Sequence, residues 1–155
     1  MEEPIVQDVP AQTVIALQRR GSHNEIGEVY RELHAWARAH DVTVRGNGLT
    51  IFLDPPQAFD PKWALFEVCL PAPAGVQADE KVAVKTLPAC RVASVRVKGP
   101  YKEIPAHYTE LLAWIDYRGW SVAGAPREVY RKRPRSGDAG KPDDYLTEIQ
   151  FPIEE

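Results

Sequence analysis

The chain has 155 residues, of which 44% are hydrophobic, and a formal net charge of −3 at neutral pH. This length allows one compact domain with its own core. The near-neutral charge excludes the strong positive field with which many proteins bind nucleic acid, and the apolar runs are too short to span a bilayer.

In chain order, the first half predicts strand, strand, helix, strand and strand. Short β-branched stretches predict the strands, and apolar residues at helical spacing predict the helix. Ser22 and Glu25 have the spacing of a capping box at the helix start. The elements lie at about 4–8, 13–18, 24–40, 49–53 and 64–70, with Ile26, Tyr30, Leu33 and Ala37 on one helix face.

The second half predicts the same order of elements. Pro105 falls in the first turn of its helix, where proline is tolerated, and Gly119 is placed to end that helix. The charged stretch 131–144, RKRPRSGDAGKPDD, is predicted to be a mobile loop. Its basic start is interpreted as solvated, because acidic residues follow. The elements lie at about 82–86, 91–97, 102–118, 127–132 and 145–151, with Ile104, Tyr108, Leu111 and Ile115 on one helix face.

The two halves repeat one sequence. When residues 9–36 are aligned with 87–114, an offset of 78, eleven of the 28 pairs are identical, against about two expected from average composition. The match resumes between 66–71 and 147–152 at an offset of 81. We therefore predict a single domain over 1–155 built by tandem duplication, with repeat 1 at about 4–71, a linker at 72–81 and repeat 2 at about 82–152.

The predicted fold is α+β. Two duplicated β-β-α-β-β units would form one antiparallel sheet assembly that carries two helices, related by pseudo-twofold symmetry. One such unit alone has a thin core. The junction between two units would be a natural cleft, and ligand sites favour such junctions.

Two matched glutamates are the first candidate site residues. Glu67 and Glu148 each lie in the last strand of a repeat. Leu65 and Cys69 share the strand face of Glu67, and Leu146 and Gln150 share that of Glu148. Either this face is exposed to solvent and the glutamates are ordinary, or they are partly buried. In the second case we expect desolvation to raise the pKa of Glu148, and a cationic ligand would relieve the cost of the buried charge.

Four matched aromatic residues are the other candidates. Tyr30 and Tyr108 lie on the apolar helix faces, and Trp36 and Trp114 lie further along the same helices. Their rings either pack in the core or line a ligand site. No nucleophile elbow, phosphate-binding glycine loop or zinc-ligand spacing is present. We therefore expect no metal and no cofactor.

Location and partners are also expected from the sequence. Cys69 and Cys90 are the only cysteines and the acidic N-terminal stretch has no apolar signal region, so we expect reduced thiols in the cytoplasm. The predicted partner is a small hydrophobic or aromatic molecule. We expect no membrane contact and no direct contact with nucleic acid, and the sequence leaves the oligomeric state open.

Two stretches of the chain resemble the GyrI-like small-molecule-binding superfamily. They are LPACRVASVRVKGPYKEIPAHYTELLAWI at 87–115, with its Gly-Pro-Tyr turn and spaced Tyr, Leu and Trp, and YLTEIQFPI at 145–153. The superfamily includes effector-binding domains of AraC-type and MerR-type regulators, multidrug-sensing domains, gyrase-inhibitor proteins and hydrolases of cyclopropane-bearing toxins. The resemblance implies an aromatic cleft between the halves with the family glutamate, matched by Glu148, at its floor.

Three functions follow from this resemblance. The first is a stand-alone domain, since no helix-turn-helix precedes it, that binds lipophilic molecules, cationic or multidrug-type ligands among them. It would use Glu148, Tyr108, Trp114, Tyr30, Trp36 and, with less support, Glu67. The second is a hydrolase in which Glu148 is the general base and Tyr108 donates a hydrogen bond to the leaving oxygen. The third is a protein-binding inhibitor of the gyrase type. This function calls for an exposed acidic patch, and the dispersed acidic residues weaken the case for it.

Overall fold

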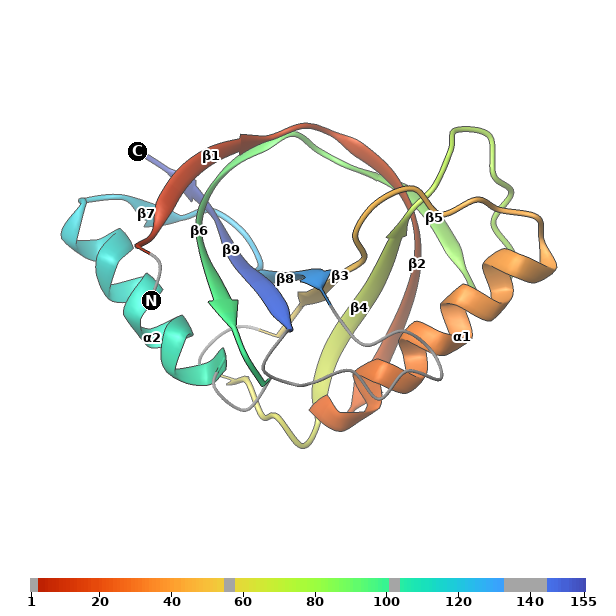
Figure 1. Ribbon diagram of the computed structural model, residues 1–155, viewed down its shortest axis with the longest axis horizontal. Coiled ribbons are helices and arrows are strands. Elements are labelled where there is room, and N and C mark those ends of the chain that lie inside the picture. The colour runs from red at the N-terminus through yellow and green to blue at the C-terminus, as the bar shows by residue number, and fades with distance from the viewer. Residues whose placement is uncertain (1–2, 55–57, 101–103, 133–144) are drawn as a thin grey trace. The chain divides into compact units, whose positions relative to one another are not determined.

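The computed structural model describes residues 3–54, 58–100, 104–132 and 145–155. The chain forms two compact units (Figure 1). One consists of residues 10–89, and the other combines residues 1–9 with 90–155. Within the described ranges, neither helix has the length and apolar character needed to cross a bilayer.

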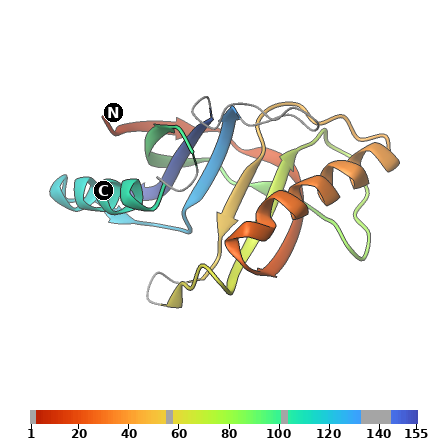
Figure 2. The same ribbon diagram turned by 60° about the horizontal axis from the view of Figure 1, so that its bottom comes forward.

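The unit of residues 10–89 is a four-stranded antiparallel sheet with one helix. Its strands run in the order β5-β2-β4-β3, and α1 packs along one face of β2 and β4 (Figure 2). Val29, Leu33 and Ala37 of α1 are buried on that side. The elements are β2 (Gln12–Gly21), a 3-10 turn η1 (His23–Glu25), α1 (Ile26–Ala39), β3 (Leu49–Phe52), β4 (Ala64–Pro71) and β5 (Ala83–Leu87).

The other unit has the same plan. Its strands run β1-β6-β9-β8, and a short strand, β7, pairs with the far end of β9. Helix α2 covers one face of the sheet (Figure 1), and its residues Leu111 and Ile115 pack on Ile149 and Phe151. The elements are β1 (Ile5–Val9), β6 (Cys90–Lys98), α2 (Ile104–Tyr117), β7 (Ser121–Val122), β8 (Arg127–Lys132) and β9 (Leu146–Glu154).

The first strands of the two predicted repeats are exchanged. β1 pairs with β6 of the second repeat, and β5 pairs with β2 of the first. The registers agree residue by residue: adding 78 to Ile5 and subtracting 78 from its partner Ser94 gives the observed pair Ala83 and Ala16. The compact units are therefore offset from the sequence repeats by one strand, while equivalent positions have equivalent partners.

Most predicted elements are confirmed. The α+β class, the antiparallel strands, the two helices and their β-β-α-β-β order are as expected, and β7 is an addition that the sequence did not indicate. The capping box of Ser22 and Glu25 is formed, and it starts a 3-10 turn ahead of α1. Gly119, at φ 77°, ends α2 in the left-handed conformation that favours glycine.

The predicted strand at 127–132 and the predicted loop at 131–144 overlap at Arg131 and Lys132. The strand prediction is confirmed there and the loop prediction is wrong, because β8 continues its pairing with β9 through an irregularity between Tyr130 and Lys132. The remainder of the predicted loop, 133–144, lies outside the described residues, as do 102–103 at the predicted start of the second helix. Within the described residues, neither Cys69 nor Cys90 is part of a disulfide.

Candidate functional site

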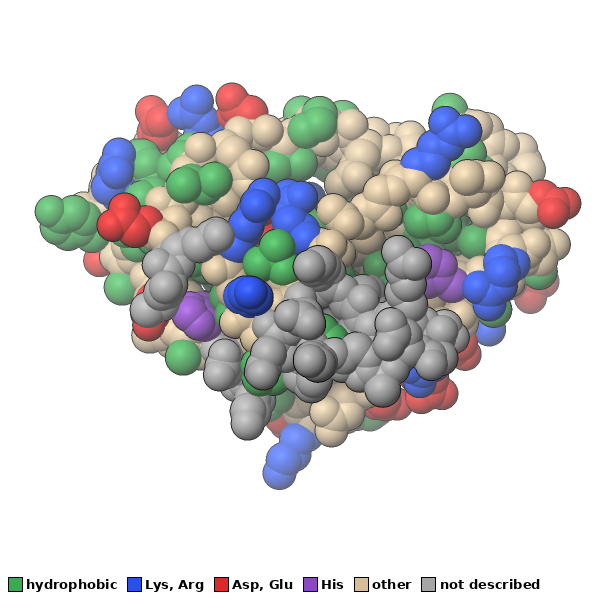
Figure 3. Space-filling view, viewed as in Figure 1, with side chains coloured by type: hydrophobic (Ala, Val, Ile, Leu, Met, Phe, Trp, Pro, Cys, Tyr) green, Lys and Arg blue, Asp and Glu red, His purple; other side chains and the backbone are tan. Residues whose placement is uncertain are grey.

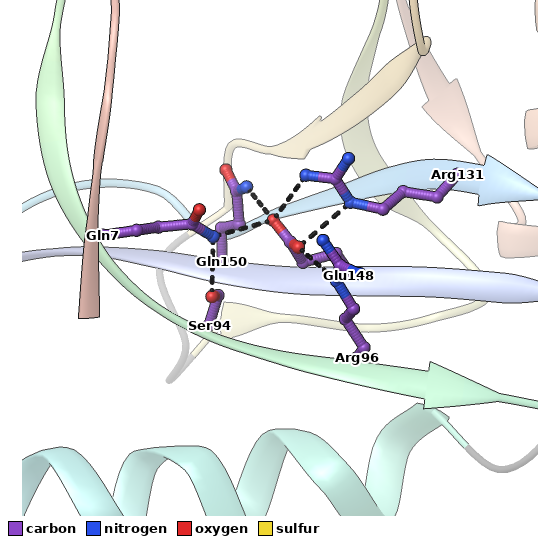
Figure 4. A network of polar contacts seen from close by, with 6 residues as sticks. All are labelled: Gln7, Ser94, Arg96, Arg131, Glu148 and Gln150. Atoms are coloured by element: carbon purple, nitrogen blue, oxygen red, sulfur yellow. Dashed lines mark hydrogen bonds and ion pairs between the residues drawn. The ribbon is translucent and has the colours of Figure 1, made fainter. Parts of the chain in front are cut away.

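Glu148 is a completely buried carboxylate on the sheet face that α2 does not cover. Its exposed fraction is 0%. Side chains alternate along β9, and Ile149 and Phe151 point into the core beneath α2. Glu148 therefore points the other way, as Figure 4 shows with α2 on the far side of the strands.

Four side chains donate five hydrogen bonds to this carboxylate (Figure 4). Arg131 donates from Nε to Oε1 at 3.0 Å and from Nη2 to Oε2 at 3.2 Å, and Arg96 donates from Nε to Oε1 at 3.1 Å. Gln7 Nε2 donates to Oε2 at 3.1 Å, and Gln150 Nε2 donates to the same oxygen. The carboxylate is thus the centre of a polar network.

The sheet brings these donors together from four strands. Arg96 lies directly opposite Glu148 in the pairing of β6 with β9. Gln7 comes from the exchanged strand β1, where it also donates to Ser94 Oγ at 2.9 Å. Arg131 is the extra residue at the irregularity in β8, and such bulges redirect a side chain relative to regular pairing.

The arginines set the charge state of Glu148. Burial alone would raise the pKa of the carboxyl. The hydrogen bonds and charge of Arg131, together with the donors Gln150 and Arg96, outweigh burial and lower the pKa below its ordinary value. The expectation of a raised pKa for Glu148 is therefore wrong, because it took account of burial and not of the two guanidinium groups. One carboxylate and two guanidinium groups leave the network with a net charge of +1.

Glu67 is the centre of the equivalent network in the other unit, with different charges. It is 4% exposed. Lys85 Nζ donates to its two oxygens at 2.7 and 2.9 Å, and Gln18 Nε2 donates at 3.2 Å. Gln18 corresponds to Arg96, and Lys85 corresponds to Gln7, at the offset of 78. This network is electrically neutral.

Tyr108 and Trp114 lie on the α2 side of their sheet, away from Glu148. The Tyr108 hydroxyl donates to Glu128 at 2.7 Å, and its ring meets Phe151 edge-on at 5.7 Å. Trp114 packs against the core beneath α2. Its neighbour Arg118 lies over the Trp114 ring, 5.3 Å from the centroid. Within this unit the structure does not bring the two aromatic candidates together with the glutamate.

Tyr30 and Trp36 are buried on the α1 side of the other sheet. Tyr30 is 4% exposed, and its hydroxyl closely approaches Gly48. Trp36 donates from Nε1 to Asp79 Oδ2 at 2.8 Å and stacks on His40, with 4.0 Å between ring centroids. The hydrogen bond of Trp36 thus connects the end of α1 to the linker. The rings of Tyr30 and Trp36 both pack on the helix side of the sheet.

Glu128 is a third buried carboxyl, and it was not among the residues that the sequence predicted for the site. It lies in β8, is 3% exposed and accepts hydrogen bonds from Tyr108 and, at 3.4 Å, from Tyr130. Burial raises its pKa to about 7, although the two tyrosine hydroxyls act in the opposite direction. Burial, followed by the nearby Glu128, also raises the pKa of Tyr108 well above its usual range.

A family model, the GyrI-like small molecule binding domain, matches residues 2–154. The chain belongs to this family. Among curated proteins, none matches the chain. Within the described part of this GyrI-like domain, no group of three or more acidic, His or Cys side chains could hold a metal ion.

Solved structures share the fold of this GyrI-like domain at low sequence identity. The C-terminal domain of EcmrR has a TM-score of 0.87 at 20% identity, covering 99% of this chain and 98% of its own. EcmrR in a complex with DNA has a TM-score of 0.89 at 19% identity over 99% of this chain, which spans 57% of that EcmrR chain. A hydrolase encoded by lin2189 from Listeria innocua has a TM-score of 0.72 at 13% identity, and the match covers 98% of this chain and 92% of the hydrolase. SAV2435 bound to tetraphenylphosphonium has a TM-score of 0.62 at 15% identity, and the match covers 99% of this chain and 94% of SAV2435.

Some of the missed site residues of the GyrI-like domain had a signal in the sequence. Arg96 occupies the repeat position of Gln18, and both stand opposite the matched glutamates once the strands are paired. Arg131 was assigned to a solvated basic run, and only the β8 irregularity turns it toward Glu148. Glu128 points to the opposite sheet face from its neighbours Arg127 and Val129, but this alternation alone does not tell which of the two faces is buried.

Proposed function

We propose that this GyrI-like domain binds a small lipophilic or aromatic molecule at the sheet face of Glu148. One observation carries the proposal: a fully buried, ionised carboxylate holds two arginine side chains that are 43% and 30% exposed. Arg96 and Arg131 are thereby fixed in position while their outer surfaces stay accessible. Such pre-positioned polar groups on a rigid sheet are typical of ligand sites.

Stability alone is a poor explanation for this network. Burying charges removes them from water, and a well-packed apolar cluster of similar volume is often equally stable or more so. Glu148 with Arg96 and Arg131 also leaves one positive charge unmatched within the network. We infer that the network serves to bind a ligand through its guanidinium groups, and not to stabilise the fold.

The ligand class is supported by the family and by one structural neighbour. SAV2435, which shares the fold, is bound to tetraphenylphosphonium, a cation whose phosphorus atom carries four phenyl rings. For this chain we propose ligands with comparable apolar surface. In this proposal Tyr108 and Trp114 support the site through the core beneath α2, since both pack on the helix side of the sheet that bears Glu148.

Isothermal titration calorimetry with a panel of aromatic lipophiles, neutral and charged, tests this function. We expect at least one to bind in the micromolar range, and Arg131→Gln to weaken that binding at least tenfold because it removes a guanidinium group from the site. The matched control is Lys85→Gln in the other network, which should leave the affinity unchanged. If no member of the panel binds, or if Lys85→Gln weakens binding as much as Arg131→Gln, the proposal is wrong.

Hydrolysis is a second candidate function, favoured by the pair of Tyr108 and Glu128. A carboxyl with a pKa of about 7 is well matched to general acid–base catalysis near neutral pH. Glu148, with its lowered pKa, is a weaker base. In this candidate reaction the Glu128 carboxylate takes a proton from water, the water oxygen bonds to a strained ring carbon, and the ring C–C bond breaks. The electron pair passes to a conjugated carbonyl oxygen of the substrate, which solvent protonates.

A turnover assay separates the two functions. The protein is incubated with an electrophilic cyclopropane substrate and the ring-opened product is followed by chromatography. Hydrolysis by this pair requires that Glu128→Gln abolish product formation while Glu67→Gln does not. It also requires a rate that rises with pH through about 7 as Glu128 loses its proton. Binding without product excludes this hydrolase function for the substrate tested.

A further inference from the structure

We propose that the Glu148 site selects ligands that carry a negative charge, which Arg96 and Arg131 bind through a carboxylate, sulfonate or similar group. The inference rests on the proposed small-molecule binding function and adds the charge of the ligand. It reverses the expectation that the buried glutamate recognises a cation.

The carboxylate of Glu148 has no capacity left for a cationic ligand. Its two oxygens offer about four lone-pair positions, and they already receive five hydrogen bonds from side chains of the protein. A cation could reach these oxygens only by displacing Arg131, Arg96 or an amide. Displacement would leave a guanidinium beside the incoming positive charge, which is unfavourable.

The guanidinium groups, by contrast, retain donors. Each carries five N–H groups in a planar fork. Arg96 contacts Glu148 through Nε alone, and Arg131 uses Nε and Nη2. Side-chain exposures of 43% and 30% make the remaining surface accessible to a ligand. A planar anion is the partner that such a fork binds best.

The surrounding charges point in the same direction. Within the described ranges of the chain, Glu148 is the only acid that forms a salt bridge with either Arg96 or Arg131. The amide groups of Gln7 and Gln150 are neutral and donate to the same carboxylate. In the space-filling view, Lys and Arg side chains lie together near the middle of the face shown (Figure 3).

The other unit provides an internal comparison. There Glu67 is matched by the single charge of Lys85, and Gln18 takes the place of Arg96. Lys85 stands at the position of Gln7, so the matched strand positions supply one cation to each network, and the extra positive charge of the Glu148 network is that of Arg131. Lys85→Gln is the matched control for the arginine variants, because it also removes one cation from a buried glutamate.

Tetraphenylborate and tetraphenylphosphonium provide the test, because they are nearly the same in shape and opposite in charge. We measure the affinity of the full chain for each ion by isothermal titration calorimetry. Tetraphenylborate is expected to bind at least tenfold more tightly. Arg131→Gln and Arg96→Gln should each reduce that preference at least fivefold, while Lys85→Gln leaves it within twofold. Circular dichroism and the unfolding temperature confirm that each variant is folded.

A second pair of measurements addresses the guanidinium geometry and needs only a conservative change. Arg131→Lys keeps the charge and loses the planar fork. It should weaken binding of 2-naphthoate at least fivefold and leave that of tetraphenylborate, which has no oxygen acceptor, nearly unchanged.

Each outcome decides the inference. Equal or tighter binding of tetraphenylphosphonium overturns it and leaves the binding function standing. A preference for tetraphenylborate that survives both Arg→Gln changes also overturns it, because the selectivity then comes from elsewhere. If neither ion nor any neutral lipophile binds, the proposed function is wrong, and the charge inference is wrong with it.

Discussion

Arg96 stands directly opposite Glu148 in the pairing of β6 with β9, and its Nε donates to Glu148 Oε1 at 3.1 Å. The same pairing in the other unit places Gln18 opposite Glu67. At the position of Gln7 the other unit has Lys85, so these two matched positions supply one cation to each glutamate. The additional charge of Arg131, the extra residue of β8, is what distinguishes the two networks.

Replacing the two glutamates is expected to have unequal effects on stability. Glu148→Gln leaves Arg96 and Arg131 close together without a counter-charge, and breaking a buried pair from one side costs about 3–5 kcal/mol. Both arginines are partly exposed and can turn toward water, so we expect about 1–3 kcal/mol. Glu67→Gln leaves only Lys85 without a counter-charge and should lower the free energy of unfolding by less. Urea denaturation at pH 7 measures both.

A double variant tests the cause of that loss. Removing Arg131 together with the Glu148 charge takes away one of the two unmatched cations. Glu148→Gln with Arg131→Gln should therefore be more stable than Glu148→Gln alone. If the double variant is as unstable as the sum of the two single changes, the stranded charge is not the reason for the loss.

Glu128 should make stability depend on pH between about 4.5 and 7. Burial raises its pKa in the folded chain to about 7 from an ordinary value of 4.5, so the folded state holds its proton more strongly than the unfolded state. The corresponding stabilisation is fully present below about pH 4.5 and is lost as pH rises through 7. A shift of this size corresponds to about 3 kcal/mol. Denaturation curves at intervals of half a pH unit measure the slope.

Two variants assign that slope. Glu128→Gln cannot titrate, so its stability should change much less between pH 5 and pH 8. Glu148 has a lowered pKa, and its contribution is lost only as pH falls below the ordinary range of a glutamate. A slope between pH 5 and pH 8 that persists unchanged in Glu128→Gln would assign the titration to another group.

The hydroxyl of Tyr108 should matter more than that of Tyr130. Tyr108 donates to Glu128 at 2.7 Å, and Tyr130 donates at 3.4 Å, which is a weaker geometry. Tyr108→Phe removes the better donor from a buried carboxyl and should cost about 1–3 kcal/mol at pH 8. The loss should shrink at pH 5, where Glu128 is neutral. Tyr130→Phe, measured in the same way, should show a smaller effect at both pH values.

Gly48 should not tolerate a side chain. A Cβ at this position would lie 1.7 Å from the Tyr30 hydroxyl, and Tyr30 is too well buried to move freely. We expect Gly48→Ala to destabilise by about 1–3 kcal/mol, as overpacking does. Tyr30→Leu, combined with Gly48→Ala, should recover part of the loss because the ring atoms nearest the new methyl group are gone. No recovery would show that the two residues do not meet.

The sequence predicted the elements well because their signals are local. β-branched runs, the Ser22–Glu25 box and the stop at Gly119 each act within a few residues, and the repeat offset supplied a second, independent copy of every element. The exchange of β1 and β5 was not predictable in this way. Each short strand fits next to either second strand, since the repeats have the same pattern, and only pairing between distant segments decides.

The site was predicted in part for the same reason. The matched position of Glu148 marked it as a candidate, but its burial, its partners and its pKa depend on side chains from three other strands. Gln7 and Arg96 reach it through sheet pairing, and Arg131 reaches it through an irregularity in β8. The aromatic candidates were predicted to line the same cleft as Glu148, because helix periodicity does not tell which sheet face bears the glutamate.

A nuclear magnetic resonance titration tests the location of the site most directly. Arginine Nε–Hε and tryptophan Nε1–Hε1 signals of the labelled protein are followed while tetraphenylborate, or any lipophile that binds more tightly, is added. Binding at the Glu148 face predicts that the Arg96 and Arg131 signals shift at the lowest ratios of ligand to protein. The chemical shifts of Trp36 and Trp114 should not change. Saturable shifts at Trp36 or Trp114 with both arginine signals unmoved would contradict the account.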